Sequence, residues 1–131
     1  MCQPSEDICK QILDLDKSIR LAAIANQMGS PVATAYRSGL EAIFSKEEID
    51  SYMIKSVLQM KSAEDFESKL GNVIYTLILY SKLKRVVVPL EHPDFSVLLV
   101  SFDNSANHDD ITVNKICPLV RKWLGNIVSQ A

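Results

Sequence analysis

The hydrophobic pattern of this chain is strongest in one uncharged stretch, Asn72–Tyr80. It contains neither Gly nor Pro and is rich in β-branched and aromatic residues, a composition typical of a β-strand. Strand alternation gives it two apolar faces: one carries Val73, Tyr75, Leu77 and Leu79, and the other carries Ile74, Ile78 and Tyr80. We therefore expect a sheet that is covered on both sides. If this strand lies at the sheet's edge, something must also pair with it.

A β-hairpin is predicted earlier in the chain. Its strands are Ile19–Asn26 and Pro31–Arg37, and the turn between them contains Gly29, which can adopt the positive φ that a tight connection requires. The strands are rich in alanine. These small side chains leave room for a bulky element, most simply a helix, to pack on the sheet.

Two more strands are predicted after the uncharged stretch. Arg85–Leu90 is mostly apolar, and Pro89 near its end marks the point where strand pairing should stop. Phe95–Phe102 is apolar on both faces. This second segment therefore suits a central strand that is buried from both sides.

Helical periodicity marks both ends of the chain. Ser5 suits an N-cap, and Ile8, Ile12 and Leu15 then recur at i, i+4 and i+7, which predicts a short amphipathic helix that ends near Asp16.

The last helix is predicted from about Asp110 to Val128, with Asn107 or Asp109 as its cap. Pro118 lies inside its apolar pattern, and proline removes a backbone donor and clashes with the preceding turn. We therefore expect the helix to be kinked or split there.

A capping box marks the start of the middle helix, where the side chains of Ser45 and Glu48 each accept a hydrogen bond from the other's backbone N–H. The helix should run to about Ser62. Its main apolar stripe consists of Ile49, Met53, Val57 and Met60. Ile54 and Leu58 lie about 100° or more around the helix from that stripe. A helix with a single core-facing side does not need them, so they predict a second buried surface.

These elements follow the order α-β-β-α-β-β-β-α. Because every connection between consecutive strands is short, the five-stranded sheet should be largely antiparallel. Two strands with apolar faces on both sides require helices above and below the sheet. The sequence thus predicts an α+β fold, a three-layer α/β/α arrangement within a single domain of residues 1–131. The first and last helices should lie on one face and the middle helix on the other.

Composition narrows the function classes. A net charge of −2 provides no positive field for binding nucleic acid, and no apolar run reaches the length of a membrane span. The first residues lack the basic and apolar regions of a signal peptide. The three cysteines, Cys2, Cys9 and Cys117, form no Cys-x-x-Cys pair. We expect a cytoplasmic protein with free thiols.

Candidate chemistry is sparse. The two histidines, His92 and His108, lack further residues at zinc-ligand spacing, and Cys117 has no histidine partner that would activate a nucleophile. Ser45 is explained by its capping role. We therefore predict no catalytic, metal or cofactor site and a non-enzymatic protein. Met28, at the hairpin tip, is a candidate partner contact, since exposed methionine suits adaptable interfaces.

The chain resembles the roadblock/dynein light chain superfamily, whose profilin-like fold is shared with longin domains. The resemblance rests on the element order, the small-residue hairpin Ile19–Arg37 with its Asn26-x-x-Gly29 turn, and the capped middle helix. Asp14–Arg20, which leads into the hairpin, and Ser68–Gly71, which leads into the third strand, look like small uncharacterised archaeal proteins of the same shape.

The resemblance implies a sheet order of 2-1-5-4-3 with the third strand at an edge. It also implies a homodimer in which third strands and middle helices of two copies meet, acting as a scaffold or regulator. The partner would be a small Ras-like GTPase or a larger assembly. The residues that we expect at the dimer interface are Tyr52, Ile54, Leu58, Tyr75, Leu77 and Leu79.

Two alternatives remain open from the sequence. In the first, the chain is a monomer in which the connection Ala63–Leu70 folds back over Ile54 and Leu58. In the second, it is a small-molecule sensor like PAS or GAF domains, with a ligand held against the alanine-rich hairpin. That function would require a cavity of about 300 Å³ or more between sheet and helix.

Overall fold

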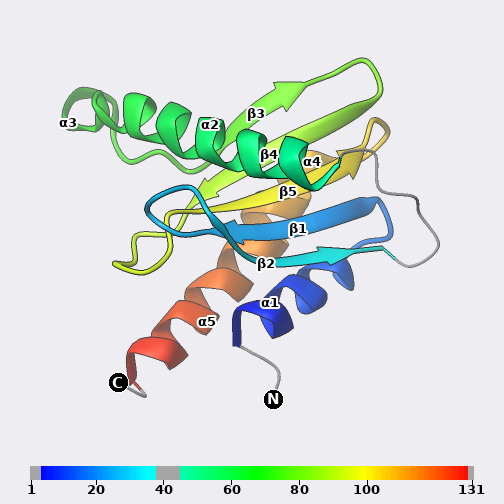
Figure 1. Cartoon of the computed structure of the whole chain (residues 1–131), viewed down its shortest axis with the longest axis horizontal. Helices are drawn as coiled ribbons and strands as arrows, with labels where there is room; N and C mark the ends of the chain where they lie inside the picture. Colours follow the sequence, from blue (N-terminus) through cyan, green and yellow to red (C-terminus); the bar gives the residue numbers. More distant parts are fainter. Residues whose placement is uncertain (1–3, 38–44, 130–131) are drawn as a thin grey trace.

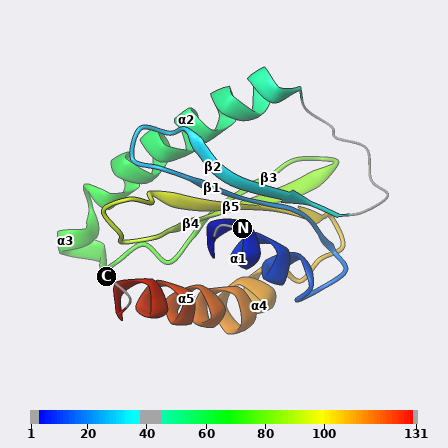
Figure 2. The same cartoon turned by 60° about the horizontal axis from the view of Figure 1, so that its bottom comes forward.

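The computed structural model describes residues 4–37 and 45–129. These residues form three layers, with a sheet between two layers of helices (Figures 1 and 2). The strands are β1 (Ile19–Ala25), β2 (Pro31–Tyr36), β3 (Thr76–Leu79), β4 (Leu83–Pro89) and β5 (Val97–Asp103). The helices are α1 (Pro4–Leu13), α2 (Lys46–Glu64), α3 (Glu67–Leu70), α4 (His108–Ile111) and α5 (Cys117–Ser129), with a π-helical turn, Thr112–Ile116, between the last two.

The sheet has the order β2-β1-β5-β4-β3, and each neighbouring pair is antiparallel. β5 lies at its centre, where Val100 is paired with Ala22 of β1 on one side and with Val86 of β4 on the other. β3 lies at one edge. The α+β three-layer fold is thereby confirmed, and so is the sheet order that the resemblance implies.

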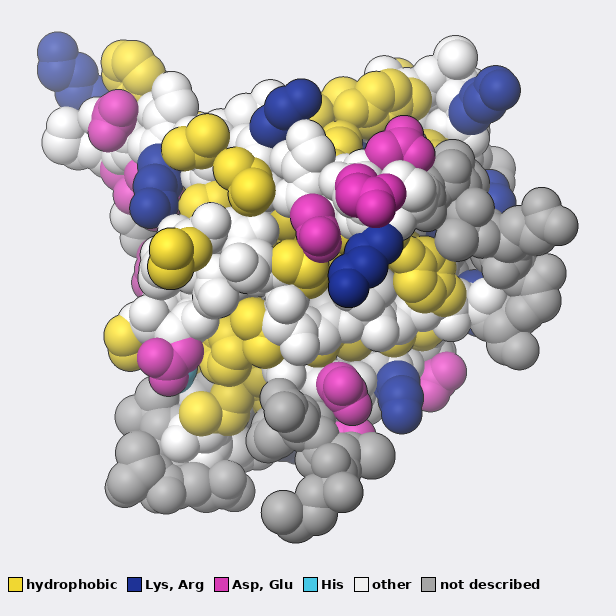
Figure 3. Space-filling model, viewed as in Figure 1, with side chains coloured by type: hydrophobic (Ala, Val, Ile, Leu, Met, Phe, Trp, Pro, Cys, Tyr) yellow, Lys and Arg dark blue, Asp and Glu magenta, His cyan; other side chains and the backbone are white. Residues whose placement is uncertain are grey.

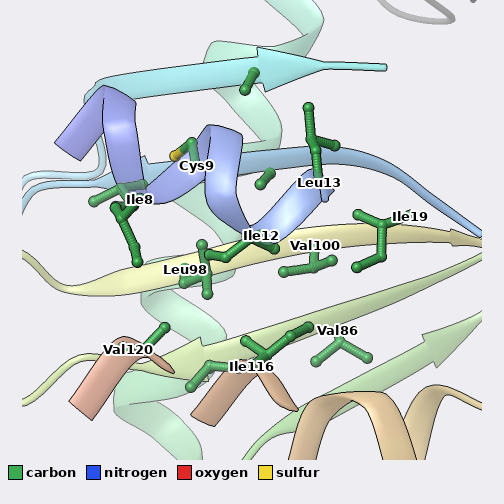
Figure 4. Packing of buried hydrophobic residues seen from close by; sticks show 14 of the residues in the cluster. Ile8, Cys9, Ile12, Leu13, Ile19, Val86, Leu98, Val100, Ile116 and Val120 are labelled. Carbon is green, nitrogen blue, oxygen red and sulfur yellow. The ribbon is translucent and has the colours of Figure 1, made fainter. Parts of the chain in front are cut away.

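One face of the sheet is covered by α1 and the C-terminal helices (Figure 2). Ile8 and Ile12 of α1 and Ile116 of the π-helical turn pack in one cluster with Leu98 and Val100 of β5 (Figure 4). All five side chains are buried. Burying an aliphatic side chain of this size contributes roughly 1.5–3 kcal/mol, so this cluster holds both ends of the chain on the sheet.

The opposite face is covered by α2. Its Met53 and Met60 are buried against Val87 of β4 and Leu99 of β5. Successive residues of a strand point to opposite faces, so a strand that buries apolar side chains on both faces, such as β5, requires helices above and below it. The predicted placement of the middle helix, opposite the first and last helices, is confirmed.

Local features of the middle helix and the hairpin also agree with the predictions. The Ser45 hydroxyl accepts a hydrogen bond from the Glu48 N–H at 3.2 Å, and the Glu48 carboxylate accepts one from the Ser45 N–H at 3.1 Å. Gly29 has a φ of 86°. A Cβ atom at Gly29 would lie 2.8 Å from Cα of Ile54, so the absence of a side chain lets the hairpin turn approach α2.

The uncharged stretch forms a shorter strand than expected. Strand pairing covers Thr76–Leu79, whereas the prediction began at Asn72. Gly71, with a φ of 87°, turns the chain after α3, and the Val73 N–H donates to the Glu67 carboxylate at 2.7 Å. Continued in the register that pairs Thr76 with Val87, Ile74 would lie opposite Pro89, which has no N–H to donate, so residues 72–75 run beside the sheet without joining it.

Several other boundaries differ from the predictions. Ser5 lies inside α1 and is not its cap, α1 ends at Leu13 and not near Asp16, and β4 begins at Leu83 and not at Arg85. Ala63–Leu70, expected as an irregular connection, contains the end of α2 and the short helix α3. β5 begins at Val97 and not at Phe95. The Phe95 ring is instead packed beside His92, at 5.0 Å between ring centroids, and beside Trp123, at 5.4 Å.

The predicted break in the last helix is confirmed. Asn107 caps α4, its side chain accepting a hydrogen bond from the Asp110 N–H at 3.4 Å. The π-helical turn then widens the helix, and the Cys117 N–H bonds to the Thr112 carbonyl, five residues back. Pro118 follows in the first turn of α5, where a missing donor is tolerated best.

Candidate interaction surface

The edge strand β3 exposes backbone groups along its outer side. Within the described ranges it pairs with β4 alone. The Tyr80 N–H donates to the Leu83 carbonyl at 2.8 Å, which closes the turn between these strands. Because inward and outward backbone groups alternate along an antiparallel strand, Ile78 shares the inward direction of Tyr80. The N–H and C=O groups of Leu77 and Leu79 therefore point away from the sheet.

The side chains of β3 are apolar on both faces. Thr76 and Ile78 are half-buried on the face covered by α2, whereas Leu77 and Leu79 lie on the other face. There they are 38% and 65% exposed. β3 itself carries no charge and no proline, the residues that commonly protect an edge strand.

An aromatic and cationic cluster joins α2 to this edge. Arg85 of β4, buried beneath α2, places its guanidinium carbon 4.1 Å from the centre of the Tyr52 ring. The Tyr52 hydroxyl lies 3.4 Å from the Tyr80 hydroxyl. Burial raises the pKa of Tyr52 to about 12, and the bond to Tyr80 adds to the shift. Tyr52 remains protonated at neutral pH. Its contacts with Arg85 and Tyr80 determine which side of α2 faces β3.

On the other face of the edge, Tyr75 is tied to α4. Its hydroxyl donates to the Asp109 carboxylate, and this bond, with burial second, raises the Tyr75 pKa to about 12. Nearby, the Lys84 ammonium donates to the Ala106 carbonyl at 2.8 Å and lies 3.3 Å from Nδ1 of His108. These bonds hold the sheet edge against the start of the C-terminal helical region.

Two exposed aliphatic residues of α2, Ile54 and Leu58, lie on the side of the helix away from β3. Ile54 lies against the turn at Gly29, and Leu58 follows it one helical turn later. They are 47% and 61% exposed, and Met28 at the hairpin tip is 85% exposed. The alternative in which residues 63–70 cover Ile54 and Leu58 is therefore wrong. Figure 3 shows hydrophobic side chains along α2 and at the hairpin tip on this face.

The six residues expected at one interface therefore occupy three places. Tyr52 faces β3, whereas Ile54 lies against the hairpin turn and Leu58 is exposed one helical turn farther along α2. The remaining three are on the opposite face of the sheet: Tyr75, Leu77 and Leu79. Tyr52 and Ile54 are two residues apart and so about 200° apart around the helix, a signal that the sequence already contained. Three further residues lie at the same edge without being predicted there: Ile78, Tyr80 and Arg85.

A hollow of about 320 Å³ opens where residues 72–74 diverge from β4. It lies between this segment, the end of β4 and α5, and its apolar lining includes Val88, Leu90, Val120 and Leu124. The hollow lies at the sheet's edge and is open to solvent. It is thus not the cavity beside the hairpin that a sensor function would lead us to expect. A hollow of about 500 Å³ does lie beside the hairpin, between Val32 and Thr34 of β2 and Ile49 of α2, but it is open to solvent and not enclosed.

The cysteines have the properties of packing residues. Cys9 and Cys117 are both buried, and burial raises the pKa of Cys9 to about 12 and raises that of Cys117. Both thiols are therefore protonated at neutral pH, whereas a nucleophile would be a thiolate. Cys2 lies outside the described residues.

Among residues 4–37 and 45–129, no three or more His, Cys, Asp or Glu side chains are grouped so that they could hold a metal ion. No helix in this part of the chain combines the length and apolarity needed to cross a bilayer.

Comparison with known proteins identifies the fold. No protein-family model matches the chain, and no curated protein matches it. Among solved structures, a roadblock/LC7 domain from Streptomyces avermitilis is similar, with a TM-score of 0.73, 9% identity and coverage of 94% of this chain and 97% of that chain. The gliding protein MglB from Thermus thermophilus has a TM-score of 0.75, 13% identity and coverage of 100% of this chain and 95% of that chain.

An MglB described in a tetrameric arrangement is also similar, with a TM-score of 0.67, 12% identity and coverage of 94% of each chain. These similarities extend over nearly the whole length of both chains. At such low identity they establish the fold alone, and this chain has the fold of roadblock domains.

Proposed function

With the roadblock fold as the premise, we propose that the protein is a cytoplasmic, non-enzymatic interaction module that acts as a homodimer through β3. One observation carries this proposal. β3 is an edge strand without charge or proline, its outward backbone groups belong to Leu77 and Leu79, and both side chains are exposed. Such an edge is a template for another strand.

The proposed dimer has a two-fold axis at Ile78. Antiparallel pairing of two β3 strands about this axis places Leu77 of one copy opposite Leu79 of the other, and the reverse. Both positions have outward backbone groups, so each forms a hydrogen-bonded pair. This register uses the whole of β3 and joins the two sheets into one. Leu77 and Leu79 then pack across the strands on one face, and Tyr52 and Tyr80 approach the axis on the other.

The role that we propose for the dimer is that of a scaffold or regulator. Following the sequence resemblance, its partner is a small Ras-like GTPase or a larger protein assembly. A binding test would compare a candidate GTPase loaded with GDP and with a non-hydrolysable GTP analogue. A regulator should bind one nucleotide state more tightly, whereas equal affinity in both states would favour a scaffold. The similarity to small archaeal proteins also remains a prediction.

The dimer is tested by substitution at the edge strand. Leu77→Pro removes an outward N–H without removing a hydrogen bond between β3 and β4, whereas Leu77→Ala keeps the N–H and shortens the side chain. Light scattering at micromolar concentration should give twice the mass of one chain for the unsubstituted protein and for Leu77→Ala, but the mass of one chain for Leu77→Pro. A monomeric unsubstituted protein would refute the proposal.

A small-molecule sensor remains a second candidate because of the hollow of about 320 Å³ beside α5. Its volume is within the range of ligand pockets, and its lining is mostly apolar. A screen of small apolar compounds by thermal denaturation would test it. A sensor predicts a ligand whose stabilising effect disappears in Val120→Trp, a substitution that fills the hollow from α5. Stabilisation that persists in this variant would place the ligand elsewhere.

A further inference from the structure

The sheet has a second edge, β2, on the side opposite β3 (Figure 1). In the part of the chain that the structure describes, β2 pairs with β1 alone. The Arg37 N–H donates to the Arg20 carbonyl of β1 at 3.0 Å, so the backbone groups of Arg37 point into the sheet. Because these directions alternate along an antiparallel strand, the N–H and C=O groups of Thr34 and Tyr36 point away from the sheet. β2 thus presents donors and acceptors to another strand.

The end of β2 is held in place by the Arg37 side chain. Its Nε donates to the Ile19 carbonyl at 2.7 Å, and its Nη2 donates to the carbonyls of Leu13 at 2.6 Å and Asp16 at 2.8 Å. Ala35 is buried in the cluster that α1 covers. The edge is therefore a preformed template, and a preformed site lowers the cost of ordering on binding.

The hollow of about 500 Å³ beside the hairpin lies along this edge, and we call it the β2 groove. Its lining includes Glu6 of α1, Thr34 and Tyr36 of β2, and Ile49 and Asp50 of α2. Since α1 and α2 cover opposite faces of the sheet, the outer edge of β2 is recessed between two helical walls.

The α2 side of the groove is apolar. Thr34 and Tyr36 are paired with Ala23 and Leu21, whose positions alternate towards the α2 face. Side chains directly opposite Thr34 and Tyr36 in an added strand would share that face and lie near Ile49. Ile49 is half-buried and the Tyr36 side chain is exposed, so an aliphatic residue there would cover apolar surface of both.

The α1 side of the groove is acidic. Alternate residues of an added strand would point to this face. Among the described residues that line the groove, Glu6 is the one charge from α1, whereas Lys46 and Asp50 from α2 carry opposite charges. A basic side chain therefore complements the α1 side, and the α2 side has no net charge preference.

We propose that the β2 groove binds an extended segment of a partner protein, in which aliphatic residues alternate with Lys or Arg, as an additional strand of the sheet. This goes beyond the β3 dimer, which leaves β2 free at both ends of the joined sheet. A second copy of the chain fits less well, because its own helix layers would meet the walls of the groove before the strands could pair. Repeated pairing of copies at β2 and β3 would also extend the sheet without limit.

Two short synthetic peptides with blocked ends test the proposal on the full chain. In one, Lys and Val alternate, and in the other Glu replaces every Lys. Calorimetric titration up to about 1 mM should show saturable binding of the lysine peptide, and the glutamate peptide should bind at least about threefold more weakly. Thr34→Pro removes an outward N–H without removing a bond between β1 and β2, so it should abolish binding, whereas Thr34→Ala should retain it.

A charge reversal tests the predicted side-chain pattern. Glu6→Lys should make the protein prefer the glutamate peptide. Asp7→Lys changes the net charge equally at an exposed neighbour that does not line the groove, so the preference for the lysine peptide should remain. Leu77→Pro should leave peptide affinity unchanged, which separates this site from the β3 dimer. Circular dichroism checks the folding of each variant, and the charge variants remain decisive if Thr34→Pro does not fold.

The proposal would be overturned by the absence of saturable binding up to that concentration, or by equal affinities of Thr34→Pro and Thr34→Ala. A preference that does not reverse in Glu6→Lys, or that reverses as fully in Asp7→Lys, would also overturn it. A second copy as the occupant predicts no saturable peptide binding and an association beyond the dimer that Thr34→Pro removes.

Discussion

At the scale of single residues, Gly29 shows how a backbone requirement and a packing requirement coincide. Its φ is positive, and a Cβ atom would overlap Ile54 of α2. Gly71 has nearly the same φ but open space around it, and helical Gly125 also has open space. Substitutions at the three glycines can therefore distinguish the energetic effect of the contact with Ile54 from that of the backbone conformation.

We predict that Gly29→Ala lowers the free energy of unfolding by about 2–4 kcal/mol, the sum of a left-handed backbone and an overpacked contact. Gly71→Ala should cost about 1–3 kcal/mol, from the backbone conformation alone, because a φ of 87° with a ψ of 175° is adopted almost only by glycine. Gly125→Ala, in the helix, should stabilise by up to about 1 kcal/mol. Urea denaturation measures all three. Equal losses at Gly29 and Gly71 would show that the contact with Ile54 has no energetic weight.

A second residue-scale prediction concerns the hydrogen bond from Tyr75 to Asp109. The Tyr75 pKa is raised from 10.0 to about 12 in the folded chain, so the protonated phenol is favoured by folding. The resulting stability is fully present below pH 10 and is lost as the pH rises towards 12. Tyr75→Phe should therefore be less stable than the unsubstituted chain at pH 7, and the difference should shrink above pH 10.

Urea denaturation at about pH 7, 9 and 11 measures this difference. Asp109→Asn is a suitable comparison, since it removes the carboxylate that is the main cause of the raised Tyr75 pKa. A Tyr75→Phe difference that stays constant across this pH range would contradict the account of the bond.

At the scale of elements, the middle helix begins where local sequence dictates. The two bonds of its capping box satisfy backbone donors that would otherwise face solvent at the helix start. We predict that Ser45→Ala lowers the free energy of unfolding by about 1 kcal/mol. Ser51→Ala, at an exposed position inside the same helix, should be neutral or slightly stabilising. A loss at Ser51 as large as that at Ser45 would argue against the cap as the cause.

The elements that sequence predicts well are those whose signals are local. The capping box, the glycine turn and the break near Pro118 each depend on residues within one or two helical turns. The start of β3 is different, because it depends on the register with β4, in which Ile74 would lie opposite Pro89, a residue without an N–H. Composition alone does not reveal that register.

The candidate site was predicted only in part for a related reason. The sequence predicts exposed apolar residues on α2, but the direction in which each side chain points depends on how the helix packs on the sheet. Tyr52 is directed to β3 by Arg85 and Tyr80, and Ile54 is directed to the hairpin by Gly29. Those neighbours are distant in sequence, so treating the apolar residues as one interface merged two surfaces.

At the scale of the whole molecule, the central claim is that two copies pair through β3 about an axis at Ile78. A cysteine scan of the strand tests this most directly. Opposed residues in a non-hydrogen-bonded antiparallel pair have Cα atoms about 4.5 Å apart, within the range that a disulfide spans. Ile78→Cys should therefore form a disulfide-linked dimer under mild oxidation. Thr76→Cys should not, because its two copies would lie about 13 Å apart along the strands.

The unsubstituted chain gives the baseline for its own thiols, of which Cys9 and Cys117 are buried. Denaturing, non-reducing electrophoresis after oxidation at micromolar concentration measures the linked fraction. The account predicts rapid and nearly complete linkage for Ile78→Cys and baseline linkage for Thr76→Cys. Equal linkage of both variants, or none above the baseline for Ile78→Cys, would contradict the β3 dimer.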